Sequence, residues 1–385
     1  MLRTVARLGR NVRVLRILAQ LVFLGVVVGL VGYLAGNLNR NLRRQGIPTG
    51  FDYLNNRAGF RILDSTFEPT QSVLDAVFVG VRNTATVAIV GIVLALIIGI
   101  VVGVARLSRN WLVRKSAAFY VEALRNIPVL VLIIFVNQAV ILQLPRIQDA
   151  GEILGVVVVS NSGISVPWPR GSADLTGFTV ALAAGALAAF GLAFWRTRKF
   201  DATGTPHHRV AWATALFLAV GITAFFAFGR PFAISFPEVE RFRILGGFRL
   251  SPQYTALLLG LVLYTASHIA EIVRGSIQAV PAGQSEAATA LGLSEFARLR
   301  FVVLPQAFRI MIPPVANQFL NLTKNSSLAV AVGYPEVTRL TQILIGNGQP
   351  PLQSIAVLML VYLSFSLVIS AVTNLVNRRL QLVTR

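Results

Sequence analysis

Ionisable side chains inside strongly apolar segments have the greatest capacity for chemistry in this 385-residue chain. Glu122 and Arg125 lie three residues apart, and Glu271 and Arg274 repeat that spacing. Residues three apart share one face of a helix, so each pair can form an ion pair. We expect a structural role for Glu271 and Arg274, because long side chains near the end of a membrane span reach the interface easily.

Polar side chains also gather inside two of the apolar segments. Ionisable groups at such depth are costly and usually face a bundle interior or an aqueous cavity. Arg125 stands just before the helix-bending Pro128, whose missing N–H leaves a carbonyl available to a cavity. The polar positions grouped in this way are Arg125, Asn126, Asn317, Lys324, Asn325, Ser326 and Ser327.

Residue types that the chain lacks exclude several chemistries. The absence of cysteine excludes disulfides, thiolate catalysis and cysteine-based metal or iron–sulfur sites. Each of the three lysines follows Arg or Thr, so no Gly-Lys pair exists. The phosphate-binding loop of a Walker-type ATPase requires that pair, and the chain therefore cannot be the ATP-binding subunit of a transporter. Any ATP and Mg²⁺ must be bound by a partner.

The histidines do not suggest a cofactor either. His207 and His208 lie in a loop, and only His268 falls in an apolar segment, which excludes a bis-histidine haem within one chain. We expect His268 to be a hydrogen-bonded bundle residue. Because no nucleophile is paired with a base, the sequence predicts no enzymatic activity, no metal site and no bound cofactor.

The elements that carry these residues are predicted to be membrane helices. The chain is 55% hydrophobic and 13% charged, whereas soluble domains carry about 25% charged residues. About 20 apolar residues in a helix cross the hydrocarbon core. The eight candidate spans are 17–36, 83–105, 118–142, 176–195, 210–229, 254–273, 308–332 and 353–376. The first is expected to be an uncleaved anchor, because it is longer than a signal-peptide core and no small-residue cleavage site follows it. The span 308–332 contains two prolines and is expected to be bent or partly re-entrant.

The basic residues predict orientation. The net charge is +20, and the basic residues are scattered in short loops between apolar runs, which favours contact with membrane lipid over nucleic acid. With the N-terminus inside, the inner segments carry 20 basic residues and the outer ones 12. The excess of positive charge predicts that both termini are cytoplasmic.

The stretch EAATALGLSEFARLRFVVLP (286–305) lies between two spans, on the predicted cytoplasmic side. Pro281 suits a first helical turn, and Gly292 suits a left-handed cap at the end of the Ala-rich helix that follows. Ser294 can cap a second short helix, which Pro305 would end. We therefore expect a helix–turn–helix at the membrane surface. The alternative is an interfacial amphipathic helix that only links two spans.

This stretch resembles the Glu-Ala-Ala loop of ABC importer permeases, with Val302 where Ile is usual. The resemblance extends to HIAEIVRGSIQAVPAGQ (268–284), PQAFRIMIPPVANQFLNLTKNSSLAV (305–330) and, more loosely, EALRNIPVLVLIIF (122–135). These segments are similar to the polar amino-acid branch of the family, and most similar to the general L-amino-acid and the glutamate/glutamine/aspartate/asparagine permeases. The resemblance implies a type I importer core of five helices in an all-α, polytopic protein of the bacterial inner membrane.

The resemblance also implies roles for residues. In that family the loop forms coupling helices that dock into a cleft on the cytoplasmic ATPase; the positions that carry this role here are Glu286, Ala287, Ala288, Gly292, Leu304 and Pro305. The implied partners are a second, homologous permease chain in a heterodimer, an ABC ATPase dimer and a periplasmic amino-acid-binding protein. A guanidinium binds a carboxylate bidentately, and Asn accepts from an ammonium. We hypothesise that Arg125, Asn317 and the segment Lys324–Ser327 line an amino-acid path near mid-bilayer.

The family core does not cover the whole chain. We expect an anchor helix and periplasmic loop (1–80), a first part of the core (81–143), an insertion with two extra spans (144–252) and a second part of the core (253–385) that includes the coupling loop (281–305). The insertion has no assigned mechanism; we expect it to pad the helical bundle or to form a lipid-facing annex, and docking of a partner is the alternative. A secondary transporter driven by an ion gradient and a non-transporting scaffold are the competing functions.

Overall fold

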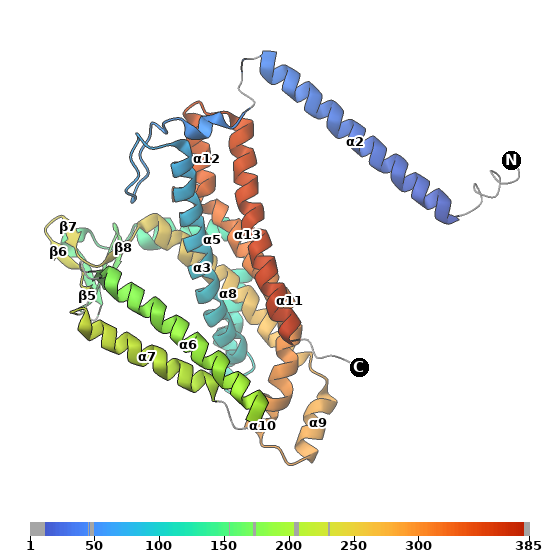
Figure 1. The fold of residues 1–385 in the computed structure, drawn as a ribbon, viewed down its shortest axis with the longest axis vertical. Coiled ribbons are helices and arrows are strands. Elements are labelled where there is room, and N and C mark those ends of the chain that lie inside the picture. Colours follow the sequence, from blue (N-terminus) through green and yellow to red (C-terminus); the bar gives the residue numbers. More distant parts are fainter. Residues whose placement is uncertain are drawn as a thin grey trace, which may run out of the picture. The chain divides into compact units, whose positions relative to one another are not determined.

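The computed structural model describes residues 12–44, 46, 50–153, 155–171, 175–203, 208–229 and 232–380 (Figure 1). Within these residues seven helices are long and apolar enough to cross a membrane, and a broken helix pair raises the number to eight. The seven segments are Leu15–Arg44, Val73–Ala105, Leu175–Phe200, Arg209–Ala227, Pro252–Gln278, Glu295–Ala331 and Pro351–Arg378. The predicted helical membrane fold is thereby confirmed.

The helices follow the order of the predicted spans. Those before the insertion are α2 (Val12–Arg44), α3 (Val73–Ala105), α4 (Trp111–Arg125) and α5 (Val129–Phe135). The insertion holds α6 (Leu175–Thr203) and α7 (Arg209–Ala227). The remainder forms α8 (Pro252–Gln278), α9 (Ala282–Ala290), α10 (Glu295–Arg298), α11 (Leu304–Asn325), α12 (Val337–Gly346) and α13 (Pro351–Leu380).

The span predicted over 118–142 is interrupted. Helix α4 ends at Arg125, and α5 begins after Pro128, whose backbone is extended with ψ 132°. Proline lacks a backbone N–H and disfavours helical conformation in the residue before it, so a break at this position is expected. A π-helical segment, Val136–Ile141, continues α5. The pair is a broken span or a re-entrant loop.

The chain forms two compact units. The first comprises residues 1–125 and 265–385, and the second residues 126–264. The second unit covers more residues than the predicted insertion (144–252), because it also includes α5 and the first half of α8, which pack against each other. A Cβ placed on Gly260 of α8 would lie 2.7 Å from Ile133 Cγ1, so the two backbones approach closely at this glycine.

Small residues bring α3 against its neighbours in the first unit. A Cβ on Gly99 would lie 2.6 Å from Ile269 Cγ2, and one on Gly103 would lie 2.7 Å from Val273 Cβ. Glycines four residues apart allow such close backbone approach in membrane helices, where packing rather than the hydrophobic effect holds helices together. At its other end α3 packs against α12. There the loop between α2 and α3 completes a buried cluster of Tyr53, Ala58, Ile62, Phe67, Val73, Ala76, Val77, Leu340 and Leu344.

The second unit contains short strands that the sequence analysis did not anticipate. One sheet has the order β1-β2-β3-β8, and two further pairs are β4-β5 and β6-β7, all antiparallel. The strands are β1 (Gly151–Ile153), β2 (Val157–Ser160), β3 (Gly163–Val166), β4 (Trp168–Gly171), β5 (Phe232–Ser235), β6 (Glu238–Glu240), β7 (Arg243–Leu245) and β8 (Phe248–Leu250). A Val-rich run before Asn161-Ser162-Gly163 was the available strand–turn–strand signal.

Two paired strands close one end of a helical hairpin. Helices α6 and α7 run side by side (Figure 1), and β4 pairs with β5 where the chain enters and leaves the hairpin. Rings from both helices and β5 meet there: Phe232 lies 5.6 Å from Phe178 and 5.2 Å from Phe225, between centroids. Along the helices, a Cβ on Gly185 would lie 2.7 Å from Val220 Cγ1. The hairpin is therefore a closely packed body.

Candidate functional site

The segment predicted to couple with a partner is a helical hairpin, α9–α10. Helix α9 begins after Pro281, which stands at its N-cap. Gly292 has φ +76°, a left-handed conformation that favours glycine. The backbone N–H of Gly292 donates to Thr289 O at 2.9 Å, and that of Leu293 donates to Ala288 O at 3.1 Å. These bonds satisfy carbonyls at the end of α9, so the turn needs no other support.

The second helix starts as predicted but does not end as predicted. Ser294 caps α10, its Oγ accepting from the Ala297 N–H at 3.3 Å. The expectation that Pro305 ends this helix is wrong: a π turn, Leu299–Val303, carries the chain directly into α11. Pro305 stands in the first turn of α11. A helix tolerates proline there because the first N–H groups have no partner in the helix.

The hairpin presents backbone and small side chains to its surroundings. Glu286, Ala287, Gly292 and Pro305 are exposed, whereas Leu304 is half-buried and Ala288 is 3% exposed. Large apolar side chains are exposed as well, namely Leu291 at 82%, Phe296 at 69% and Phe301 at 66%. An apolar surface of this kind on a loop between membrane helices is typical of a protein contact.

Polar bridges connect the hairpin to α11 and to the turn between α3 and α4. Gln306 Nε2 of α11 donates to Gln284 Oε1 of α9 at 3.3 Å. Arg109, in the turn between α3 and α4, donates to Glu295 Oε1 at 2.7 Å. Both bridges are exposed to solvent, so they contribute position more than stability.

A charge cluster of Glu271, Arg106, Arg125 and Arg274 lies at the end of α3. Arg106 Nη1 and Arg274 Nη2 both form ion pairs with Glu271, and Arg274 Nε donates to Glu271 Oε2 at 3.3 Å. Arg125 Nη1 lies 3.9 Å from the same oxygen. Burial lowers the pKa of Arg106, and the positive charge of Arg274 lowers it further. A guanidinium nevertheless keeps its charge in proteins, so the Glu271 carboxylate lies within 4 Å of three cations.

Arg106 was missed by sequence reasoning, and the predicted pairing of Arg125 with Glu122 stays a prediction. Glu122 does lie close enough to Arg106 for its charge to raise that residue's pKa. His268 Nδ1 lies at 3.4 Å from Ser267 Oγ. Asn126 is exposed at the break after α4.

A second polar cluster surrounds Glu336, which sequence reasoning also missed. This carboxylate is fully buried and caps α12, its Oε1 accepting from the Arg339 N–H at 2.9 Å. Its Oε2 accepts from Tyr362 Oη at 2.8 Å and from Thr84 Oγ1 at 3.4 Å. Ser326 Oγ lies 3.5 Å from the same tyrosine oxygen. Burial raises the pKa of Glu336. The signal in the sequence was a carboxylate just before a short amphipathic helix.

The structure separates the residues that the sequence grouped into one path. Arg125 belongs to the charge cluster beside Arg106, whereas Ser326 belongs to the cluster beside Thr84. Thr84 and Arg106 stand 22 residues apart along α3, or about 33 Å at 1.5 Å per residue. That Arg125, Asn317 and the segment Lys324–Ser327 line one amino-acid path stays a prediction, and in this structure Arg125 and Ser326 lie in different polar clusters.

Helix α11 carries an exposed polar stripe of Asn317, Asn321 and Lys324. Their spacing of four and three residues places them on one helix face, and all three are exposed. Ser327 and Asn325 follow as half-buried residues and Ser326 as a buried one. Exposed amides and an ammonium on a membrane helix are costly against lipid. The stripe therefore faces an aqueous path or another protein chain.

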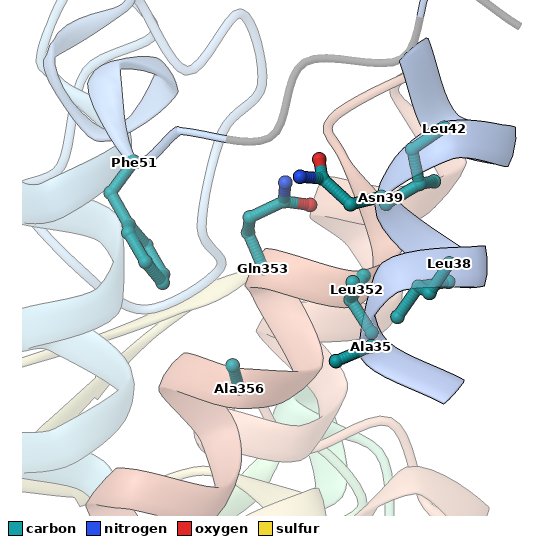
Figure 2. Close-up of a pocket in the computed structure, with 8 residues that line it drawn as sticks. All are labelled: Ala35, Leu38, Asn39, Leu42, Phe51, Leu352, Gln353 and Ala356. Atoms are coloured by element: carbon teal, nitrogen blue, oxygen red, sulfur yellow. The ribbon is translucent and has the colours of Figure 1, made fainter. Parts of the chain in front are cut away.

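A cavity of about 230 Å³ lies between the end of α2 and the start of α13, within the first unit (Figure 2). Its lining is mostly apolar and includes Leu38, Phe51 and Leu352. Asn39 and Gln353 supply the polar groups. None of its lining residues is ionisable, so this cavity offers no charge to the carboxylate or ammonium of an amino acid.

Three kinds of comparison relate the chain to known proteins. Residues 91–382 match the family described as binding-protein-dependent transport system inner membrane component. A general L-amino acid transport system permease protein of Rhizobium johnstonii is 39% identical over 368 residues, which cover 95% of this chain and 92% of the relative. A glutamate/glutamine/aspartate/asparagine transport system permease protein of Rhodobacter capsulatus is 37% identical over 406 residues, covering 96% and 94%. A chain in the crystal structure of an amino acid ABC transporter with histidines gives a TM-score of 0.48 at 17% identity, covering 80% of this chain and 94% of that one.

Proposed function

The chain belongs to the family of binding-protein-dependent transport system inner membrane components, and we propose that it couples amino-acid import to a separate ATPase through residues 286–305. It is the permease subunit of an amino-acid ABC transporter. Relatives matched over nearly their whole length are amino-acid permeases, which favours this reading over transport driven by an ion gradient.

The α9–α10 hairpin carries the proposal. It joins the span Pro252–Gln278 to the span Glu295–Ala331, and its turn is closed by the left-handed Gly292 and the cap of Ser294. Its exposed surface combines the small Ala287, the carboxylate of Glu286 and the apolar Phe296 and Phe301. Small side chains let a partner's groove approach the helix backbone, and exposed aromatic side chains are frequent anchors in protein interfaces. An ATPase that binds here would hold ATP and Mg²⁺, since this chain lacks the Gly-Lys pair of a Walker phosphate-binding loop.

The polar stripe on α11 supports a translocation path. Lys324 offers a positive charge to a substrate carboxylate, and Asn317 and Asn321 offer amide oxygens to an ammonium. The Lys324 ammonium makes no hydrogen bond or ion pair to any other described residue of the chain. A second permease chain, packed against this stripe, would close the path and shield it from lipid.

The remaining partners follow from the family's architecture. A binding protein on the outer side would deliver the amino acid, and an ATPase dimer would close on ATP and move the hairpins. In the bacterial inner membrane, the ATPase then contacts the chain from the cytoplasm and the binding protein contacts it from the outer side. The excess of basic residues in the inner segments favours the orientation that this arrangement needs, with both termini cytoplasmic. Substrate selection would then rest largely with the binding protein.

Gly292→Val tests the coupling role, because a β-branched residue is strongly disfavoured at φ +76°. Gly283→Val in α9 is the matched control, since a Cβ there meets open space at an ordinary φ. The strain of about 1–3 kcal/mol should distort the turn, and the ATPase should no longer co-purify with the Gly292→Val chain. Full co-purification and uptake at the level of the control would refute the role of the hairpin.

A further inference from the structure

The free end of the α6–α7 hairpin has no role in the proposed coupling or transport. We propose that this end, the hairpin tip, is a binding surface for the headgroups of anionic phospholipids. The hairpin tip is defined by Trp195, Arg196, Arg198, Lys199, Arg209 and Trp212.

Basic and aromatic side chains are interleaved at the hairpin tip. Arg196 of α6 stacks on the ring of Trp212 of α7, with 5.1 Å from its guanidinium carbon to the ring centroid. Lys199 Nζ lies 5.3 Å from the centroid of Trp195, and the Arg198 guanidinium carbon lies 4.5 Å from that of Phe194. A ring orders the flexible cation above it. Residues 195–209 hold four basic residues and a single acidic one, so the tip is cationic.

The position of the hairpin tip favours lipid as the occupant. It lies where the spans Leu175–Phe200 and Arg209–Ala227 end. Trp195 and Trp212 are each 54% exposed. Tryptophans at the ends of spans settle at headgroup level, and lysines and arginines just beyond attract anionic lipids. A guanidinium stacked on a ring still directs its in-plane N–H groups outward, where they can bind phosphate oxygens bidentately.

The side chains exposed along the hairpin also favour contact with lipid. Large apolar side chains are exposed along both helices, among them Leu187 at 74% and Phe190 at 74% on α6 and Ile222 at 59% on α7. Such faces suit acyl chains, and the basic tip continues them toward the headgroups. The strands close the opposite end of the hairpin.

Tryptophan fluorescence can test the proposal in the full-length chain. The chain has four tryptophans, so Trp111→Phe with Trp168→Phe leaves only the two at the hairpin tip. This protein is reconstituted into nanodiscs of phosphatidylcholine that contain about 10% of a brominated lipid. Brominated phosphatidylglycerol should quench several times more strongly than brominated phosphatidylcholine at the same fraction, because the anionic lipid is enriched at the tip. Equal quenching by the two lipids would overturn the proposal.

Charge variants separate headgroup binding from simple proximity to the bilayer. Changing the four basic residues of the tip to glutamine should lower the preference for phosphatidylglycerol at least about tenfold, since each basic residue contributes roughly fivefold near an anionic surface. Changing the three arginines to lysine should keep most of it. The control changes four exposed arginines elsewhere to glutamine and should leave the preference intact; these are Arg146, Arg170, Arg241 and Arg243.

The same variants test whether an acidic surface of a partner protein, rather than lipid, binds the hairpin tip. If the glutamine variant keeps its lipid preference but loses the co-purifying ATPase, the tip is a protein contact and the proposal is wrong. Circular dichroism and size-exclusion profiles that match the unmodified chain establish that the variants fold. A loss of lipid preference shared by the control variant would likewise refute a specific surface.

Discussion

Replacing Glu271 with glutamine removes the carboxylate with which both Arg106 and Arg274 form ion pairs. Arg106 and Arg274 lose their ion pairs and are left close together, with side chains 14% and 29% exposed. Removing one partner of a fully buried ion pair costs about 3–5 kcal/mol, while an exposed pair contributes about 0–1 kcal/mol. The Glu271 side chain is 25% exposed. We therefore expect Glu271→Gln to lower the free energy of unfolding by about 2–4 kcal/mol, between these limits.

The matched control is Glu295→Gln, which removes a carboxylate from a second Glu–Arg pair in the same part of the chain. There the Arg109 and Glu295 side chains are 87% and 64% exposed, so water and salt screen the pair. Its loss should change the free energy of unfolding by less than about 1 kcal/mol. Both variants are compared by denaturation in mixed micelles, followed by circular dichroism at two salt concentrations.

A second substitution tests the physical reason for the cost. Much of the cost of Glu271→Gln comes from the positive charges that have lost their shared carboxylate. Arg274→Gln removes one of these charges, so in the Glu271→Gln background it should recover part of the lost stability. The same Arg274→Gln change in the unmodified chain should be destabilising. The reasoning is refuted if Glu271→Gln is no more costly than Glu295→Gln, or if the two changes at the cluster are simply additive.

Three further predictions concern packing, buried charge and transport. Gly103→Ala should cost about 1–3 kcal/mol of unfolding free energy by overpacking against Val273, whereas Gly275→Ala, which meets open space, should cost nothing in the same denaturation assay. Burial raises the pKa of Glu336, so the folded state holds its proton more tightly than the unfolded state. The free energy of unfolding should therefore fall as pH rises above the ordinary glutamate pKa of 4.5. In Glu336→Gln, the same measurement over the same pH range should lack this fall. Lys324→Gln should lower amino-acid uptake into proteoliposomes at least about tenfold while the ATPase still co-purifies; unchanged uptake would remove Lys324 from the path.

Local chemistry accounts for what the sequence predicted well. Apolar runs located the spans because about 20 residues are needed to cross a bilayer. The turn of the coupling hairpin followed from Gly292 and Ser294, since a left-handed cap and an N-cap are local backbone requirements. The continuation past Pro305 did not follow. A proline is compatible both with the end of one helix and with the first turn of the next, and the π turn that joins them has no sequence signature.

Contacts between distant parts of the chain account for what the sequence could not predict. Arg106 pairs with a carboxylate 165 residues away, and Thr84 bonds Glu336 across 252 residues. Periodicity tells which residues share a face of one helix but not which helix that face meets. Arg125 was grouped with Lys324 because both are charges inside apolar segments. Only the tertiary structure shows that Arg125 lies in the cluster with Arg106, whereas Ser326, two residues after Lys324, lies in the cluster with Thr84.

The position of α3 along its neighbouring helices affects the polar clusters at both of its ends. At one end a Cβ on Gly80 would lie 2.9 Å from Val337 Cα, beside the cap that Glu336 forms. At the other, Gly103 lies against Val273, three residues before Arg106 enters the charge cluster. A slip of one helical turn would move Arg106 by about 5.4 Å, beyond reach of its carboxylate, and would break the Glu336 cluster as well. The small residues of α3 therefore determine whether either polar cluster can form, although none of them carries a functional group.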